Sequence, residues 1–438
     1  MNLAEQVQKA GVVGAGGAGF PTHVKLRGKA DTYIANGAEC EPLLHKDATV
    51  MERETEQLIR GLRLAGEAVG AQRLVIAVKE KKKAAVAAIR QAIQGTEVEL
   101  FLLGDYYPAG DEYDLVYTVT GRLIPPMGIP LQVGVVVNNV ESLLNIARAA
   151  DGQPVTHKYL TVGGAVAHPV TVRVPIGTPI RDLLPLAGGT TVDDPVFFLG
   201  GLMMGPVTDD LDTPVTKTLT GVIVLSRQHP VSQRRMMPVE MKNRVGKSAC
   251  DQCRYCTEFC PRYLLGYAVE PHRVMRGLGF TAMGQDFWNQ WALLCCGCGL
   301  CTMYSCPEGL FPKEACDQAK AQARAAGVRW EGPKEVHPHP MREGRRVPIQ
   351  RLIRRLHVEA YDQPAEFVET EVQPERLFLP LRQWVGQPAV PQVRLGDRVQ
   401  PGQLIAAPPK DALGATLHSP IAGRVAQVDE NQIVLERI

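Results

Sequence analysis

The chain has 438 residues and a formal net charge of +2, with 48 basic and 46 acidic side chains. This near balance gives no strong field that would favour nucleic acid, and no apolar run approaches the ~20 residues that span a bilayer. The length suggests about three domains, and the absence of a basic and apolar leader at Met1 predicts a cytoplasmic protein.

Residues 1–155 are predicted to form an α/β domain, because helical and strand patterns alternate along them. Branched apolar runs predict the strands, and amphipathic patterns predict the helices between them. The expected helices are 3–10, 47–69 and 81–93, and the expected strands are 32–36, 74–78, 98–103 and 134–137.

A glycine-dense loop follows the first predicted helix. Its glycines formally match G-x-G-x-x-G, but no strand precedes the loop and Phe20-Pro21 follows it, so the match alone is weak. Glycines let backbone N–H groups approach a phosphate, and Lys25 adds a cation. We therefore expect a phosphate-bearing cofactor, with a plain tight turn as the alternative. The loop glycines are Gly14, Gly16, Gly17 and Gly19.

Three further polar motifs lie in the same domain, and each alone is typical of a solvated turn. Glu39 and Glu41 stand two residues apart, which places both carboxylates on one side of an extended segment. Residues 107–112 form an acidic turn. Asn138-Asn139 ends a predicted strand, where α/β sheets place their ligands.

The remainder of the chain is predicted to contain four parts, which makes the fold class multidomain α/β and α+β. Residues 156–235 form a small α+β module, with strands at 158–162 and 170–174 and a short helix at 181–187. Residues 240–325 are cysteine-rich and helical, and 326–375 form a linker with one basic helix at 349–357. Residues 376–438 are all-β and resemble a biotinyl/lipoyl-type barrel-sandwich. A carrier domain of that type presents a lysine between two methionines at the tip of a hairpin, but the corresponding loop here has Lys410 and no methionine. We therefore expect a structural or docking module and not a swinging carrier arm.

Two cysteine sets predict two [4Fe–4S] clusters. The first set has the spacing C-x2-C-x2-C-x3-C followed by proline, a pattern in which the fourth cysteine serves the other cluster. Structural zinc is the alternative, although zinc sites use C-x2-C pairs set well apart. Four residues separate Cys301 from Cys306, which makes Cys306 the least regular ligand, and Cys40, Cys296 and Cys316 are left over. The expected ligands are Cys250, Cys253, Cys256 and Cys306 for one cluster, and Cys295, Cys298, Cys301 and Cys260 for the other.

The order of four motifs resembles the flavin subunit of complex I. The motifs are GAGGAGFPTHVK from Gly14, NGAECEP from Asn36, YPAGDE from Tyr107 and NNVE from Asn138. Ala15 and Ala38 depart from that family, which has arginine and aspartate there. The resemblance implies FMN contacts from Gly14, Gly16, Lys25, Asn36, Tyr107, Gly110, Asn138 and Asn139. It implies nicotinamide contacts from Phe20, Lys25, Glu39, Glu41 and Glu112, and it places Gly17, Gly19 and Asp111 within the same motifs.

The order of modules resembles the C-subunit group of the Rnf complex, with an SLBB-like β-grasp segment at 161–184. The C-terminal position of the barrel-sandwich is similar to cobalamin reductases of propanediol-utilisation microcompartments. That family implies NADH-dependent reduction of cob(III)alamin towards cob(I)alamin, which supplies a corrinoid adenosyltransferase inside or on a bacterial microcompartment. We expect no essential acid, base or nucleophile. The cofactor chemistry supports such an electron-transfer chain independently of the resemblance, because a flavin accepts two electrons from NADH together and releases them one at a time to iron–sulfur clusters.

Alternatives stay open for the electron acceptor, for the way cobalamin is bound and for the role of a basic stretch. The protein could instead pass electrons between NADH and ferredoxin or another redox partner, as an Rnf-like electron-entry subunit. No D-x-H-x-x-G motif marks a cobalamin site, so we expect a weakly bound cobalamin or one presented by the adenosyltransferase. The basic stretch 342–355 could dock an acidic partner or a shell protein, although charge runs are usually solvated faces.

Overall fold

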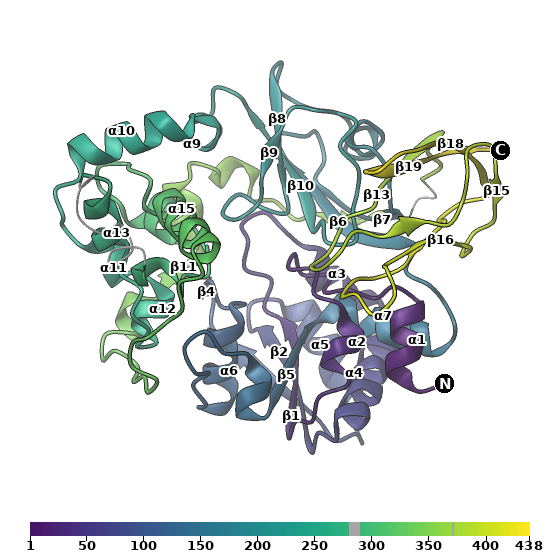
Figure 1. Ribbon diagram of the computed structural model, residues 1–438, viewed down its shortest axis with the longest axis horizontal. Coiled ribbons are helices and arrows are strands. Elements are labelled where there is room, and N and C mark those ends of the chain that lie inside the picture. The colour runs from purple at the N-terminus through teal and green to yellow at the C-terminus, as the bar shows by residue number, and fades with distance from the viewer. Residues whose placement is uncertain (280–289, 370–371) are drawn as a thin grey trace.

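The computed structural model describes residues 1–279, 290–369 and 372–438. In Figure 1 the N-terminal module lies at the bottom, the second module above it, the cysteine-rich module to the left and the C-terminal strands to the right. Both chain ends lie on the right, because the C-terminal module packs against the first helix. Thr416 Oγ1 donates to the Lys9 carbonyl at 3.0 Å in that contact.

A parallel four-stranded sheet in the order β3-β2-β1-β5 forms the centre of the N-terminal module. In its register Ile34 lies between Val75 and Val137. Its inner strands are apolar on both faces because helices cover both sides. The strands are β1 (Thr32–Gly37), β2 (Arg73–Lys79), β3 (Val98–Leu103) and β5 (Val135–Asn139).

Alternate residues of the sheet face two separate cores. Ala35 and Ile76 pack against α3, α4, α5 and α7, whereas Ile34 and Val75 face α6. The single helix predicted over 47–69 is two helices, because Thr55 Oγ1 donates to the Met51 carbonyl, a bond that bends helices. The helices are α1 (Leu3–Lys9), α2 (Thr22–Lys25), α3 (Lys46–Arg53), α4 (Thr55–Val69), α5 (Lys83–Ala92), α6 (Glu112–Thr120), η1 (Pro130–Val133) and α7 (Val140–Ala150).

The second module is a six-stranded mixed sheet in the order β12-β7-β6-β10-β8-β9. β6 and β7 form an antiparallel hairpin, and β10 runs parallel to β6. Ile180 and Leu183 of the one α-helix fill the core on one face. The elements are β6 (His157–Gly164), β7 (Val170–Pro175), α8 (Ile180–Leu183), η2 (Leu184–Ala187), β8 (Pro195–Leu199), β9 (Val207–Thr208), β10 (Gly221–Ser226) and β12 (Glu366–Phe367).

The described part of the cysteine-rich module consists of helices, most of them short, joined by irregular segments (Figure 1). The longest, α15, packs against α13 and α10. The elements are α9 (Pro230–Met236), α10 (Val239–Ala249), α11 (Tyr255–Glu258), α12 (Pro261–Leu264), α13 (Pro271–Gly277), η3 (Gln290–Ala292), η4 (Cys301–Ser305) and α15 (Pro312–Ala325).

The segment expected to be a linker takes part in two sheets. Its strand β11 (Val347–Pro348) pairs antiparallel with β4 (Tyr106–Tyr107) of the first module. Its strand β12 joins the edge of the second sheet beside β7. Between them, α16 (Ile349–Arg355) buries Leu352 in a core shared by the first three modules. The segment therefore ties the modules together.

The C-terminal module contains two small sheets, in the orders β13-β19-β18-β15 and β14-β16-β17. Leu379, Ile405 and Leu435 fill the space between them as part of the N-terminal core. Within the described residues, no helix is both long and apolar enough to cross a membrane. The strands are β13 (Arg376–Pro380), β14 (Val390–Pro391), β15 (Arg398–Val399), β16 (Leu404–Ala407), β17 (Leu417–His418), β18 (Gly423–Val428) and β19 (Gln432–Arg437).

Candidate flavin and cluster sites

The glycine loop lies against the carboxyl end of β5. Its ends are joined by bonds from the Gly14 N–H to the Phe20 carbonyl and from the Gly19 N–H to the Gly14 carbonyl, at 2.9 and 3.2 Å. A Cβ at Gly16 would lie 3.2 Å from Asn139, whereas one at Gly17 would meet nothing within 4 Å. The loop is therefore packed on one side and open on the other.

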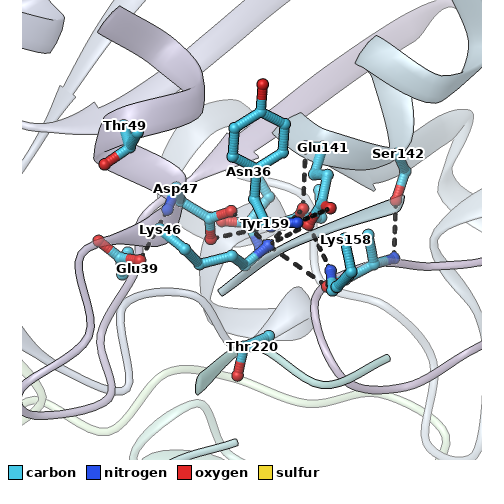
Figure 2. Close-up of polar contacts among 12 residues, drawn as sticks. Asn36, Glu39, Lys46, Asp47, Thr49, Glu141, Ser142, Lys158, Tyr159 and Thr220 are labelled. Carbon is cyan, nitrogen blue, oxygen red and sulfur yellow. Dashed lines mark hydrogen bonds and ion pairs between the residues drawn. The ribbon is translucent and has the colours of Figure 1, made fainter. Parts of the chain in front are cut away.

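A buried ionic network lies beneath the loop (Figure 2). Lys46 and Lys158 both donate to Glu141 Oε2 and to the Ala15 carbonyl, with Ala15 accepting at 3.3 and 2.9 Å. Lys46 also contacts Asp47 Oδ1 at 2.8 Å. Two cations and two carboxylates thus balance each other while both lysines fix the loop.

The network joins the first two modules, because Lys158 begins β6 while Glu141 lies on α7. Burial lowers the pKa of Lys158 to about 8 although Glu141 opposes the shift. Burial also raises the pKa of Asp47, with Lys46 acting against it. At pH 7 Lys158 therefore keeps its proton, which its bond to Glu141 requires.

Two asparagines at the carboxyl ends of neighbouring strands have polar groups near this loop. Asn36 Nδ2 donates to the Gly110 carbonyl at 3.1 Å, which joins two of the predicted motifs. Asn138 is buried, and its Nδ2 has no partner among the described residues. A buried donor without an acceptor is costly, so this amide fits a site that a flavin would complete.

The acidic motif residues make separate contacts. Glu39 accepts from the Asp47 N–H at the start of α3 at 2.8 Å and lies 3.7 Å from Lys82. Glu112, at the start of α6, lies 3.6 Å from Lys25, whose Nζ donates to the Val137 carbonyl at 2.7 Å. Lys25 therefore connects α6 to the end of β5.

Glu41 instead points into a turn of the second module. Its two oxygens accept the N–H groups of Met203 and Met204, both at 3.0 Å. A Cβ at Gly201 would lie 2.5 Å from the Glu41 carboxyl, so the turn requires glycine there. Burial raises the pKa of Glu41 to about 7. The expectation that Glu39 and Glu41 lie on one side of an extended segment stays a prediction, and the two carboxylates accept from N–H groups of different modules.

The first three thiols of the first cysteine set line one cavity, together with Cys306 from the second set. The Leu310 N–H donates to Cys306 Sγ at 3.3 Å. The extra residue between Cys301 and Cys306 is absorbed by η4, which is a turn of π-helix, the usual way a helix accommodates one inserted residue. The four thiols that line this cavity are Cys250, Cys253, Cys256 and Cys306.

The second set is more deeply buried. Burial raises the pKa of the Cys301 thiol, and the neighbouring thiols Cys295, Cys256 and Cys260 raise it further. The neighbouring Cys296 thiol and burial raise the pKa of the Cys298 thiol, and Cys260 and Cys301 act in the same direction. The two sets adjoin, because α11, which contains Cys256, packs against η4, which begins at Cys301. Among the described residues, no group of His, Cys, Asp or Glu is arranged to hold a single metal ion.

Two contacts connect the N-terminal module to the expected cluster whose ligands are Cys260 and three thiols of the second set. The Tyr107 hydroxyl donates to the Cys298 carbonyl at 2.6 Å, and both residues are buried. Arg262, two residues after Cys260, forms a 2.8 Å ion pair with Asp111. Tyr107 and Asp111 belong to the predicted flavin motif, so the second set is the one next to that site.

Sequence reasoning missed the lysines of the buried network. Lys46 and Lys158 carry no motif, and their partner Glu141 is 95 and 17 residues away. The NNVE motif contained Glu141 but gave no sign that it would bind two cations. The third missed lysine, Lys217, lies between three modules and donates to the Gly11 and Thr416 carbonyls at 2.7 and 2.8 Å.

Four family models match the chain, and they confirm the predicted fold class. The Nuo51 FMN-binding domain matches residues 7–148, and the SLBB domain matches 159–207. The 4Fe-4S dicluster domain matches 249–311, and the RnfC barrel sandwich hybrid domain matches 360–437. The choice of iron–sulfur clusters over zinc and the choice of FMN are confirmed by these matches.

Curated relatives match nearly the whole chain. "Cobalamin reductase PduS" of Salmonella typhimurium is 44% identical over 437 residues, which are 99% of this chain and 96% of the relative. A component of the proton-translocating ferredoxin:NAD(+) oxidoreductase complex of Clostridium ljungdahlii is 33% identical over 59% of this chain and 55% of its own length. A solved NAD+-reducing [NiFe]-hydrogenase aligns at a TM-score of 0.49 and 22% identity, covering 77% of this chain and 68% of that chain.

Proposed function

Because the chain belongs to the cobalamin reductase family, we propose that it transfers electrons from NADH to cob(III)alamin through FMN and two [4Fe–4S] clusters. The hydride of NADH carries two electrons, and each reduction of cobalt takes one. One NADH therefore suffices to take one cob(III)alamin to cob(I)alamin, with release of NAD+ and a proton. Bound FMN would accept the two electrons together and release them singly, as the clusters require.

The contact of Tyr107 with Cys298 carries this proposal. It places a residue of the flavin motif directly on the backbone of a cysteine from the second set. The helix α11, which contains Cys256 of the first set, packs against η4, which begins at Cys301 of the second set. The arrangement supports a linear order, in which the second set is nearest the flavin and the first set is farthest from it.

We assign the cofactor roles by position. The glycine loop, Lys25 and the asparagines at the ends of β1 and β5 would bind FMN. Phe20, Glu39 and Glu112 would border the nicotinamide. Glu41 would position the turn at Gly201, because both of its oxygens already accept backbone N–H groups. The eight cysteines of the two sets would ligate the clusters, and thiolate donors suit iron–sulfur centres.

The downstream partner follows from the product. Cob(I)alamin is a strong nucleophile that water and oxygen consume, so a corrinoid adenosyltransferase close by is the partner we propose. The resemblance to cobalamin reductases of propanediol-utilisation microcompartments supports a place in propanediol utilisation, and we propose that the protein acts in or on a microcompartment, where it could contact a shell protein.

Anaerobic NADH oxidation with cob(III)alamin as acceptor tests the function. Glu112→Gln should raise the KM for NADH, and Cys253→Ala should abolish cobalamin reduction while a flavin-level acceptor such as ferricyanide is still reduced. Glu56→Gln, at an exposed glutamate of α4, is the matched control. Normal cobalamin reduction by Cys253→Ala would contradict the linear route.

The rival acceptor is ferredoxin, because the Clostridium relative belongs to a ferredoxin:NAD(+) oxidoreductase complex. The same assay with oxidised ferredoxin separates the two. Rapid ferredoxin reduction without any cobalamin reduction by the wild-type protein would favour the rival.

A further inference from the structure

An open cleft of about 640 Å³ lies beside the first cysteine set. Its volume is within the range of small-molecule sites, roughly 300–1,000 Å³. Three aromatic rings and three arginines contribute most of its wall, a mixture that suits a ligand with a conjugated face and an anionic group. The lining residues are Tyr255, Phe259, Tyr304, Ser305, Pro307, Arg351, Arg354, Arg355 and His357.

Within the part of the chain that the structure describes, the arginines of this cleft form no ion pair with an acidic side chain. Arg351 and Arg354 stand one turn apart on the exposed side of α16, and neither forms an ion pair within the described part of the chain. Arg355 Nη2 donates to the Cys306 carbonyl at 3.2 Å. Nearby arginines outside the cleft behave differently, since Arg342 and Arg346 pair with Asp114 and Glu343. The aromatic residues that line the cleft together with these arginines favour a binding site over a solvated face.

The position of the cleft suits electron delivery. Tyr255 precedes Cys256, and Ser305 and Pro307 flank Cys306. These are ligands proposed for the cluster farthest from the flavin. A molecule in the cleft would therefore lie against the last carrier of the proposed route.

The rim of the cleft also contains a strained residue. His357 follows α16 with φ +58°, a region that glycine usually occupies at helix ends. Its carbonyl accepts from His229 Nε2 at 3.0 Å. Residues in sparsely populated backbone regions cluster at ligand sites. The backbone conformation of His357 is therefore consistent with a ligand site in this cleft.

We propose that this cleft binds the corrinoid substrate, with Arg351 and Arg354 on its phosphodiester and the tyrosines against its conjugated ring. The proposal rests on the proposed function. A cluster held by the adjoining thiols would supply electrons singly: the first would take cob(III)alamin to cob(II)alamin, and a second would take it to cob(I)alamin. The open side of the cleft lets a ligand larger than the cavity extend into solvent.

Equilibrium binding of cob(III)alamin and cob(III)inamide to the complete holoprotein tests the site. Cobinamide lacks the phosphate-bearing nucleotide loop. Arg351→Gln/Arg354→Gln should weaken cobalamin binding roughly tenfold, because charge-assisted bonds to phosphate are lost, but it should leave cobinamide binding unchanged. Arg90→Gln/Arg324→Gln removes the same charge from exposed helical positions elsewhere and should bind both corrinoids as the wild type does.

A second variant tests the aromatic wall. Tyr255→Ala should weaken the binding of both corrinoids, while NADH-dependent ferricyanide reduction stays normal. Wild-type cobalamin binding by Arg351→Gln/Arg354→Gln, or an equal loss for cobinamide, would overturn the assignment. That result differs from failure of the proposed function, in which the wild-type protein itself reduces no cobalamin.

Discussion

Replacing Lys158 with methionine tests whether the buried network fixes the glycine loop. The change removes the 2.9 Å bond to the Ala15 carbonyl and one of two cations on Glu141. Glu141 retains Lys46 and the Tyr159 N–H, at 2.8 and 3.1 Å. The site then carries one uncompensated negative charge where a flavin phosphate would bind.

The expected loss follows from these contacts. A hydrogen bond to a charged group contributes about 1.5–3 kcal/mol, which is roughly a 10- to 150-fold change in affinity. Because Lys46 still donates to the Ala15 carbonyl at 3.3 Å, we expect the lower end, a roughly tenfold weaker affinity for FMN. Lys158→Met/Glu141→Gln restores the charge balance and should bind FMN more tightly than Lys158→Met alone.

Titration of the flavin-free protein with FMN, followed by quenching of flavin fluorescence, gives each dissociation constant. Lys29→Met, at an exposed lysine of the same module, is the matched control. Equal FMN affinity in Lys158→Met and the wild type would refute the positioning role. Simple addition of the two single losses in the double variant would refute the charge argument.

Four other outcomes follow. Cys306→Ala should lower the iron content from about eight to about four per chain with flavin retained; unchanged iron would remove Cys306 from the ligand set. Tyr107→Phe should lower thermal stability by about 1–2 kcal/mol, because the Cys298 carbonyl loses its donor; an unchanged melting temperature contradicts this. Burial lowers the pKa of Lys217 to about 7, so the unfolded chain binds a proton that the folded chain lacks, and stability should rise as the pH rises from 7 towards 10.5. A Lys217→Met melting series should lose that slope, and an identical slope would show that another group titrates. Gly19→Ala places a Cβ 3.1 Å from the Trp384 backbone of the C-terminal module, at φ +65°, and should weaken the docking of that module, seen as faster proteolysis at its junction; a wild-type digestion rate would contradict it.

The modules were predictable because their signals are local. Alternating strands and helices, three cysteines within seven residues and paired β-turns each lie in a short window, and the family models confirm the modules. The individual flavin and cluster ligands remain predictions, although the cavity lined by Cys253 and Cys306 agrees with their grouping.

What could not be predicted depends on contacts between distant residues. Lysine is usually exposed, so nothing in the sequence marks Lys46, Lys158 or Lys217 as buried. Their partners are backbone carbonyls and carboxylates far away in the sequence, and for Lys158 and Lys217 they lie in other modules. Strands of two residues, such as Val347–Pro348, are too short to show a period, so the segment that contains them was predicted to be a linker.

The pairing of Val347 with Tyr107 has a consequence for biosynthesis. A ribosome releases the N-terminal module first, yet its strand β4 has no partner until 240 further residues have been made. The strand β4, whose Tyr107 contacts the second cysteine set, therefore stays unpaired while the ribosome synthesises both cysteine sets. Cluster insertion can precede closure of that edge, so late closure would let the assembly machinery reach the thiols before α16 covers them.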